Sequence, residues 1–307
     1  MKRIEFRAMG SRILAVLDAV SFEAEQALQC LPAWFEEWEN ALSRFRPGNE
    51  LDRLNCSAGR PMSVSQTLWD VFHAARRAEQ ATGGLVTPTI LDALVGAGYD
   101  RSFDFLPSVQ TGHSFTSPGL PGPSAAIVWD VPSRSLILPD SVHLDLGGVA
   151  KGWAAHQAVQ RLSSFGPVLV DAGGDIAISA SPKDAPAWPV GISDPFNSGV
   201  HFETLKLADC GVATSGTDYH RWLKDGLWQH HIIDPRTGYP AESDVLAATV
   251  VAPTVMEAEA AAKAVLILGS QAGLDWLEFD SGLAGVLVLE NGNYIYSQNM
   301  EKHLWRN

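Results

Sequence analysis

The sequence predicts an α+β fold in which antiparallel sheets pack against helices. Short apolar runs bounded by glycine-rich turns alternate with longer segments whose apolar residues have helical spacing. Asn291-Gly292, between two apolar runs near the end of the chain, is a strong hairpin signal. Strands joined by such turns, together with three or four amphipathic helices, are typical of this class.

The first half of the chain is expected to hold strands followed by three helices. Residues 6–17 are expected to form a glycine-interrupted edge strand that leads into a buried strand, and the helices are expected at 22–44, 50–55 and 65–81. Ser65 is a suitable N-cap for the third helix, and Gly83-Gly84 a suitable end. The Pro-, Gly- and Ser-rich stretch at about 101–124 is expected to be a flexible surface loop.

The second half is expected to alternate strands with two alanine-rich helices at 150–163 and 255–268. Thr254 and Glu257 match a capping box at the head of the second helix. The expected strands are 125–130, 135–138, a short one ending at Asp145, 167–171, 176–178, alternating segments within 186–209, 228–234, 245–251, 286–289 and 294–296. A length of 307 residues fits one large unit or two closely packed lobes, and we expect residues 1–307 to form a single unit.

Composition excludes several classes of function. The 35 acidic and 22 basic residues give a net charge of -13, which argues against binding of nucleic acid or anionic membranes. No apolar stretch approaches the roughly 18 residues of a membrane span. Cys30, Cys56 and Cys210 are odd in number and widely spaced, so we expect free thiols. With no signal peptide visible after Met1, the cytoplasm is the expected location.

Four glycine-bearing turns follow predicted strands. They are Met9-Gly10-Ser11, Gly147-Gly148, Gly173-Gly174-Asp175 and Ser215-Gly216-Thr217. Each turn by itself has a purely structural explanation. Together, their backbone amides can converge on a phosphate chain, with Lys151, Arg221 or Arg236 as compensating cations.

The stretch from Val142 to His156 reads as a strand, a glycine turn and the start of a helix. Free N–H groups at a helix N-terminus favour an anion, so a phosphate is expected here, with Asp145 and Lys151 framing one pocket. The alternative is an ordinary connection with a surface salt bridge.

Two further pairs of residues carry possible chemistry. His231 can act as a general base, because a histidine has an ordinary pKa of about 6.5 and a carboxylate such as Asp234 can orient its ring. Glu259 and Lys263 are four apart on one helix face, where a simple surface ion pair is the default. Zinc-ligand spacing, a Walker loop and a G-x-S-x-G motif are all absent from the sequence.

Taken together and in order, these segments resemble the ApbE family of FAD:protein FMN transferases. The matching motifs are Met9-Gly10-Ser11, Ser43 to Asn55, Asp145 to Gly152, Gly173-Gly174-Asp175, Ala213 to Tyr219 and His231 to Gly238. The resemblance covers most of the chain and implies two interleaved lobes with FAD between them.

The resemblance also implies an activity. Such enzymes cleave FAD at its pyrophosphate, transfer FMN to a Thr or Ser hydroxyl of an acceptor protein and release AMP, assisted by Mg²⁺. The residues implied to hold FAD are Met9, Phe45, Asp145, Gly147, Gly148, Lys151, Gly173, Gly174, Asp175, Ser215 and Gly216. His231 is implied to be the base for the acceptor hydroxyl, and Lys151 to neutralise phosphate charge. The alternatives are a catalytically silent FAD-binding protein and an FAD diphosphatase that yields FMN and AMP.

The sequence departs from the family pattern at two places. The family's metal ligands, an Asp and a Thr on the last long helix, fall at Glu259 and Lys263, and a main-chain carbonyl near Gly148 completes the implied set. Glu can bind a hard cation, but an ammonium cannot. The second departure is Thr87, where the family usually has Asp before Pro-Thr.

Overall fold

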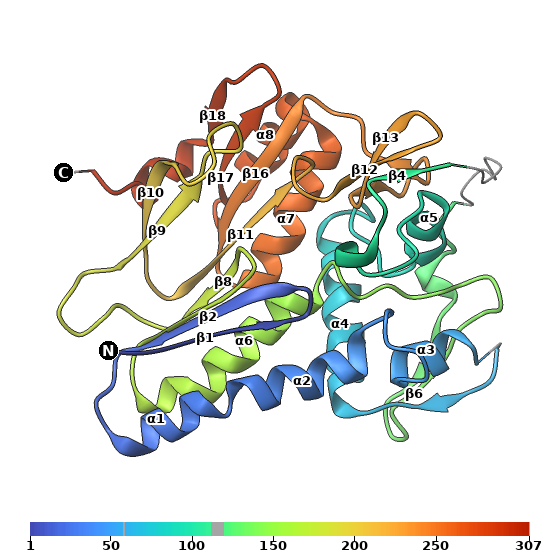
Figure 1. Ribbon diagram of the computed structural model, residues 1–307, viewed down its shortest axis with the longest axis horizontal. Helices are drawn as coiled ribbons and strands as arrows, with labels where there is room; N and C mark the ends of the chain where they lie inside the picture. The colour runs from blue at the N-terminus through green and yellow to red at the C-terminus, as the bar shows by residue number, and fades with distance from the viewer. Residues whose placement is uncertain (58, 112–119, 307) are drawn as a thin grey trace. The chain divides into compact units, whose positions relative to one another are not determined.

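The computed structural model describes residues 1–57, 59–111 and 120–306, and the chain divides into two compact units (Figure 1). Unit 1 comprises Met1–Phe35, Lys151–Asp218 and Glu242–Asn307, and unit 2 comprises Glu36–Ala150 and Tyr219–Ala241. The two units are therefore interleaved along the sequence, as the resemblance predicts.

Unit 1 is built on an eight-stranded sheet in which every neighbouring pair is antiparallel, which confirms the predicted class. Its strands, in spatial order, are β1 (Lys2–Ala8), β2 (Ser11–Leu17), β7 (Val168–Ala172), β8 (Asp175–Ile178), β11 (Cys210–Gly216), β16 (Val245–Ala252), β17 (Ala284–Leu289) and β18 (Tyr294–Tyr296). The first two form a hairpin where an edge strand leading into a buried strand was predicted, and the last two form the hairpin predicted at Asn291-Gly292.

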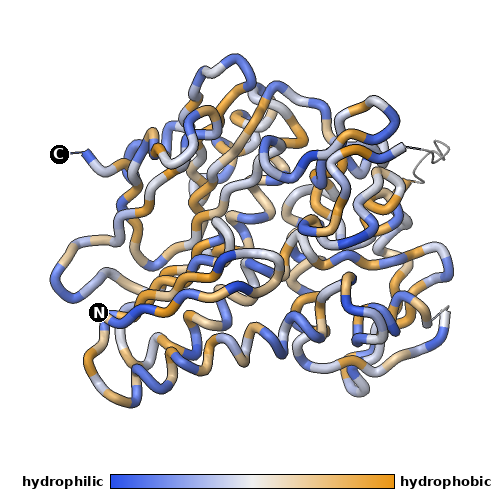
Figure 2. Tube along the Cα trace, viewed as in Figure 1, coloured by the Kyte–Doolittle hydropathy of each residue, from blue (hydrophilic) through white to orange (hydrophobic). Residues whose placement is uncertain are grey.

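Both faces of this sheet are covered. On one face, Val212, Val251 and Val286 pack against the hairpin of β9 (Trp188–Ser193) and β10 (His201–Leu207). On the other face, Val250 and Leu287 pack against α7 (Val255–Leu268) and α8 (Ser270–Phe279). In Figure 2 the N-terminal hairpin alternates hydrophobic and hydrophilic residues, in agreement with the half-exposed pattern of β1, whereas β8 and β17 are buried along their whole length.

The helices of unit 1 begin and end at clear local signals. α7 starts with the predicted capping box, in which Thr254 and Glu257 bond each other's backbone N–H groups, and it ends at Gly269, whose φ is 82°. The other elements of unit 1 are α1 (Phe22–Gln29), α6 (Ala150–Leu162), which begins one residue before this unit, and the 3₁₀ segments Ser163–Phe165 and Gln298–His303.

Unit 2 combines short helices with small sheets. Its helices are α3 (Glu50–Asn55), α4 (Gln66–Ala81), which the predicted N-cap Ser65 opens, α5 (Leu91–Gly96) and the 3₁₀ turns Phe103–Phe105 and Ser124–Ala126. Its sheets are β3 (Met62–Ser63) with β6 (Ser135–Ile137) and β5 (Val128–Asp130), β13 (Leu227–His230) with β12 (Arg221–Lys224) and β4 (Val109–Gln110), and β14 (Ile233–Asp234) with β15 (Tyr239–Pro240).

The single helix predicted for residues 22–44 is wrong. The chain forms α1 and then α2 (Leu31–Leu42), separated at Cys30. Pro32 explains the break, because a proline inside a helix lacks the N–H for the ladder and its ring clashes with the preceding turn. At the second helical position of α2, the same residue is tolerated.

The strand predicted to end at Asp145 is also wrong, since residues 142–146 have no regular structure. The Asn55 side chain bonds both the N–H and the C=O of Leu144, at 2.8 and 2.9 Å, and Asp145 N–H donates to the Pro88 carbonyl at 2.8 Å. These partners satisfy the backbone in place of a neighbouring strand.

Three other segments differ from prediction. The strand predicted for 228–234 is interrupted between β13 and β14, and α8 forms at Ser270–Phe279, where no helix was predicted. The described part of the 101–124 stretch contains two 3₁₀ turns and β4, while residues 112–119 lie outside the described residues. Among the helices of the described ranges, none is long and apolar enough to cross a bilayer.

Candidate functional site

Three of the four predicted glycine turns lie in unit 1, and they meet at one end of its sheet. The turn at Met9-Gly10 joins β1 to β2, and Ile13 of β2 pairs with Ala172 of β7, so the Gly173-Gly174 turn lies beside it. β11 runs antiparallel to β8 and pairs Ala213 with Asp175, which places Ser215 and Gly216 at the same end. The antiparallel order thus brings together residues that are far apart in sequence.

The backbone at these turns has conformations that favour glycine. Gly10, Gly173 and Gly174 have φ values of 68°, 69° and 95°, and Met9 has a φ of 51°. A Cβ on Gly173 would also lie 2.6 Å from Ser11 Oγ, so the two turns approach too closely for a larger residue. Gly174 N–H donates to Asp171 Oδ1 at 2.7 Å, which fixes the second turn.

Lys151 and Asp175 form an ion pair beside these turns. Lys151 lies in the first turn of α6, and Asp175 is the first residue of β8. The Asp175 side chain is 3% exposed, whereas that of Lys151 is 27% exposed. Lys151 Nζ also lies 3.9 Å from Glu259 Oε1. One ammonium therefore compensates two buried carboxylates while keeping a face open to solvent.

Glu259 lies on α7 where this helix approaches α6. Its side chain is completely buried; Oε2 accepts the Gly152 N–H at 3.2 Å, and Oε1 accepts from Lys263 Nζ at 3.0 Å. A Cβ on Gly152 would lie 2.6 Å from Oε2, so only glycine allows this approach. Glu259 is completely buried and Lys263 is only 15% exposed, so the simple surface ion pair considered from the sequence is wrong.

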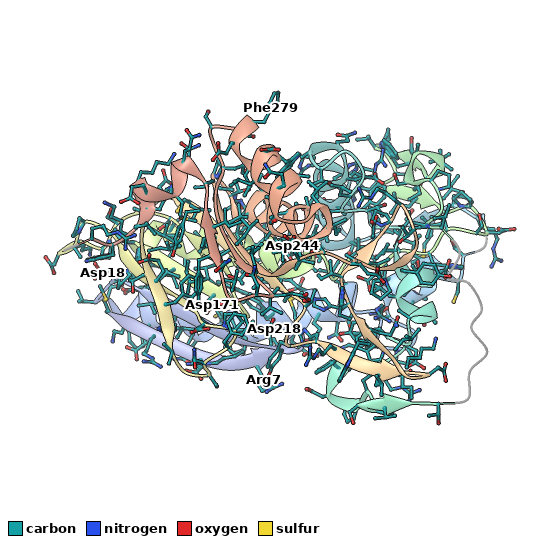
Figure 3. All side chains as sticks on the ribbon, turned by 90° about the horizontal axis from the view of Figure 1, so that it is seen from above. Arg7, Asp18, Asp171, Asp218, Asp244 and Phe279 are labelled. Carbon is teal, nitrogen blue, oxygen red and sulfur yellow. The ribbon has the colours of Figure 1, made fainter. Side chains whose placement is uncertain are left out.

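Burial and neighbouring charges shift the pKa values of this cluster. Burial, reinforced by the nearby charge of Asp175, raises the pKa of Glu259 to about 7 despite the opposing effect of both lysines. Burial would lower the pKa of Lys151, but the charges of Asp175 and Glu259 outweigh it and raise that pKa. Burial also raises the pKa of Asp171, the β7 residue labelled in Figure 3, against the bond from Gly174 N–H.

Unit 2 contains a buried ion pair that the sequence did not predict. Arg44 Nε lies 2.6 Å from Asp145 Oδ2, and the two side chains are 7% and 9% exposed. The guanidinium carbon of Arg44 lies 4.1 Å from the ring centre of Phe45 and 4.6 Å from that of Tyr99. Within the described ranges, Arg44 Nη2 is buried with no hydrogen-bond partner. Arg44 lies inside the Ser43–Asn55 motif, but nothing local in the sequence indicates its partner 101 residues away.

The Asp145 carboxylate also orders the glycine turn that follows it. Its Oδ1 accepts the Gly147 N–H at 2.8 Å, and a Cβ on Gly147 would lie 3.0 Å from the same oxygen. Gly148 follows within this turn, just before α6 begins. Because Asp145 bonds Arg44 and Gly147, its position is set by unit 2 itself.

His231 lies in unit 2 at the interruption between β13 and β14. Its ring stands perpendicular to that of His220, with ring centres 5.1 Å apart, and Phe103 packs edge-on against His220 at 4.4 Å. Asp234, considered above as an orienting carboxylate, accepts three side-chain hydrogen bonds from Arg236, the shortest at 2.7 Å.

The remaining candidates make local contacts. The Arg221 guanidinium lies over the Trp228 ring at 4.7 Å, and the Arg236 side chain, 56% exposed, pairs with Asp234. Thr87 donates its hydroxyl to Glu79 Oε1 at 2.8 Å. These contacts give each residue a structural role within unit 2.

A family model, described as the ApbE family, matches residues 9–287. The chain belongs to this family. A protein from Treponema pallidum named "FAD:protein FMN transferase" is 31% identical over 265 residues, covering 80% of this chain and 72% of the relative. A Vibrio cholerae protein of the same name is 28% identical over 246 residues, covering 78% and 72%.

Solved ApbE structures share the fold of this chain. The ApbE protein from Thermotoga maritima superposes with a TM-score of 0.84 at 24% identity and covers 99% of both chains. The apo form of the flavinyl transferase ApbE from Pseudomonas stutzeri gives a TM-score of 0.81 at 21% identity, covering 100% of this chain and 97% of its own.

The residues at the ApbE metal position do not fit Mg²⁺. Magnesium requires a near-octahedral set of oxygen ligands, but Glu259 Oε1 faces the ammonium groups of Lys263 and Lys151, and its Oε2 accepts a backbone N–H. A dication and an ammonium about 4 Å apart repel by ~8 kcal/mol at an effective dielectric constant of about 20. No group of three metal-binding side chains occurs within the described residues. The carbonyl of Gly148 as a ligand stays a prediction.

Proposed function

We propose that this chain is an FAD:protein FMN transferase that modifies a Thr or Ser hydroxyl of an acceptor protein. The observation that carries the proposal is the convergence of Met9-Gly10, Gly173-Gly174 and Ser215 at one end of the sheet, beside the Lys151–Asp175 pair. Closely approaching glycine backbones and an ammonium suit a pyrophosphate. The names of the two relatives support the same reaction.

In the proposed reaction, the acceptor hydroxyl oxygen attacks the phosphorus on the FMN side of the FAD pyrophosphate. A new oxygen–phosphorus bond forms, the bond to the bridging oxygen breaks, and AMP leaves with that oxygen. The hydroxyl proton passes to His231 and then to solvent. Positioning and charge neutralisation supply most of the catalysis in phosphoryl transfer.

Different residues of this chain are assigned to phosphate neutralisation and to FAD binding. We assign Lys151 to neutralising charge on the phosphates, because Asp175 fixes its ammonium while part of its side chain stays exposed. Met9, Gly173, Gly174, Ser215 and Gly216 line the phosphate position. In unit 2, Asp145 positions Arg44, whose unpaired Nη2 suits an acceptor atom of FAD, and Phe45 offers an aromatic face for its ring systems.

A reducing compartment fits this proposal. Cys30, Cys56 and Cys210 are all free thiols, as the sequence predicts. We therefore propose that the acceptor protein is met in the cytoplasm.

The first experiment incubates the purified protein with FAD and a domain bearing an acceptor Thr, and follows FMN attachment by mass spectrometry together with AMP release. His231→Gln should lower the transfer rate by about 10²- to 10⁴-fold without weakening FAD binding, because it removes only the general base. His201→Gln, at an exposed position on β10, is the matched control and should transfer normally.

The outcomes separate the alternatives. FMN-modified acceptor with equimolar AMP supports a transferase. AMP and free FMN without acceptor modification would indicate an FAD diphosphatase. Tight FAD binding with neither product would contradict the proposal and leave a silent flavin-binding protein.

A further inference from the structure

Lys263 is an unusual residue for its position. It lies on α7, whose buried residues are otherwise almost entirely apolar, and its side chain is only 15% exposed. A buried ammonium is costly unless it is paired. Its Nζ donates to Glu259 Oε1, one turn earlier on the same helix, at 3.0 Å. The helix therefore carries a largely buried cation of its own next to Glu259.

This cation completes an alternating row of charges. Asp175 pairs with Lys151, Lys151 lies near Glu259, and Glu259 pairs with Lys263. When all four groups are ionised, the two carboxylates and two ammoniums sum to zero. Without Lys263, the Lys151 ammonium would be shared between two carboxylates, with less of its charge left for a phosphate. Lys263 neutralises Glu259 and so keeps Lys151 available.

Lys263 also prevents a divalent cation from using the same carboxylate. Its Nζ occupies the approach to Glu259 Oε1, and Oε2 is held by the Gly152 N–H at 3.2 Å. The side chain cannot donate a lone pair to a metal while it is protonated. Replacing it with a hydroxyl-bearing residue would remove the competing charge and add a ligand oxygen.

We propose that Lys263 is a built-in cation that takes the place of a divalent metal ion, so that this chain transfers FMN without bound metal. The inference rests on the proposed function. Bond changes are those of the transfer step: the acceptor oxygen–phosphorus bond forms, the pyrophosphate bond to AMP breaks, and the hydroxyl proton goes to His231. Lys263 acts through Glu259 as a positioning residue.

The test combines metal binding with activity at pH 8. Binding of Mn²⁺, as a paramagnetic probe for the Mg²⁺ position, is measured by electron paramagnetic resonance in the presence of FAD. The wild-type chain should leave Mn²⁺ free at concentrations up to ten times that of the protein, and its transfer rate should change less than twofold in EDTA. Lys263→Thr should bind about one Mn²⁺ per chain, and EDTA should lower its transfer rate at least tenfold.

Two control variants separate this role from a structural one. Lys263→Met removes the charge without adding an oxygen, so it should neither bind Mn²⁺ nor regain activity with metal. Lys206→Thr makes the same replacement at an exposed position of β10 and should behave as wild type. Thermal unfolding of each variant shows whether it is folded.

The binding readout keeps the inference testable if transfer itself fails. Stoichiometric Mn²⁺ binding by the wild-type chain, or EDTA-sensitive transfer restored by Mg²⁺, would overturn it. A wild-type chain that binds no Mn²⁺ but transfers no FMN would overturn the proposed function, whereas Mn²⁺ binding by Lys263→Thr alone would still support the cation assignment.

Discussion

At the scale of single residues, the site depends on how buried charges compensate one another. Asp175 and Glu259 are almost completely buried, and Lys151 and Lys263 are the cations that face them. Such a cluster adds little net stability over apolar packing, yet removing one member is costly because its partner stays buried and charged. Each residue is therefore sensitive to substitution for reasons separate from catalysis.

Lys151→Met should lower the free energy of unfolding by about 2 to 4 kcal/mol, because it leaves Asp175 without its cation. Urea unfolding at pH 8 measures the loss. Lys151→Met combined with Asp175→Asn removes both charges and should recover at least half of it. Equal losses in the single and double variants would contradict this explanation.

The pKa of Glu259 gives the folding stability a pH dependence. The folded-state value of about 7 lies above the unfolded value of about 4.3, so the folded chain binds this proton more tightly. The resulting contribution to stability is complete below about pH 4 and is lost as the pH rises to about 7. Compared with Glu259→Gln, the wild-type chain should therefore lose stability between pH 5 and pH 8, measured by urea unfolding. A pH-independent difference between the two would show that burial does not raise this pKa.

At the scale of secondary structure elements, the close approach of α6 and α7 depends on Gly152. Replacing glycine with alanine inside a helix normally stabilises it by up to about 1 kcal/mol. Here the added Cβ would lie 2.6 Å from Glu259 Oε2 and 3.4 Å from the Val255 carbonyl. The carboxylate cannot move freely, because Lys263 and the Gly152 N–H hold it.

Gly152→Ala should therefore destabilise the chain by about 1 to 3 kcal/mol, reversing the usual sign. Combining it with Glu259→Asp shortens the opposing side chain by one methylene and should restore part of the loss, a coupling that a double-mutant cycle in thermal unfolding measures. Simple additivity of the two substitutions would show that they do not meet.

Elements with local signals could be predicted from the sequence, and those set by distant partners could not. Ser65 and the Thr254–Glu257 capping box locate the starts of α4 and α7 because a cap bonds residues two or three positions away. The irregular structure of residues 142–146 could not be predicted, because their backbone groups form hydrogen bonds with Asn55 and Pro88, which are distant in sequence. The break between α1 and α2 does have a local signal, which is Pro32.

The same division applies to the candidate site. The glycine turns could be predicted because glycine pairs follow predicted strands, and strand order then explains why three of them meet. The ion pair between Arg44 and Asp145 could not be predicted from the sequence, because the two residues are 101 positions apart. Burial of Lys263 was equally hidden, since helical spacing alone gives the same pattern for an exposed pair.

At the scale of the whole molecule, the chain crosses between its two units four times. Two of the crossings fall inside helices, at Phe35–Glu36 in α2 and at Ala150–Lys151 in α6. Helices form cooperatively. If one unit unfolds, α2 and α6 each lose part of their length, and the part left in the other unit becomes less stable. The larger stretch of unit 2 is also tethered to unit 1 at both ends, which limits the entropy it gains on unfolding.

The two units should therefore unfold in one transition. Hydrogen exchange measured by mass spectrometry in increasing guanidinium should show both units losing protection together. Phe72→Ala in unit 2 and Leu287→Ala in unit 1, both fully buried, should each cost about 2 to 5 kcal/mol and shift the loss of protection in both units equally. If each substitution shifted the loss of protection only in its own unit, the two units would unfold independently despite their interleaved sequences.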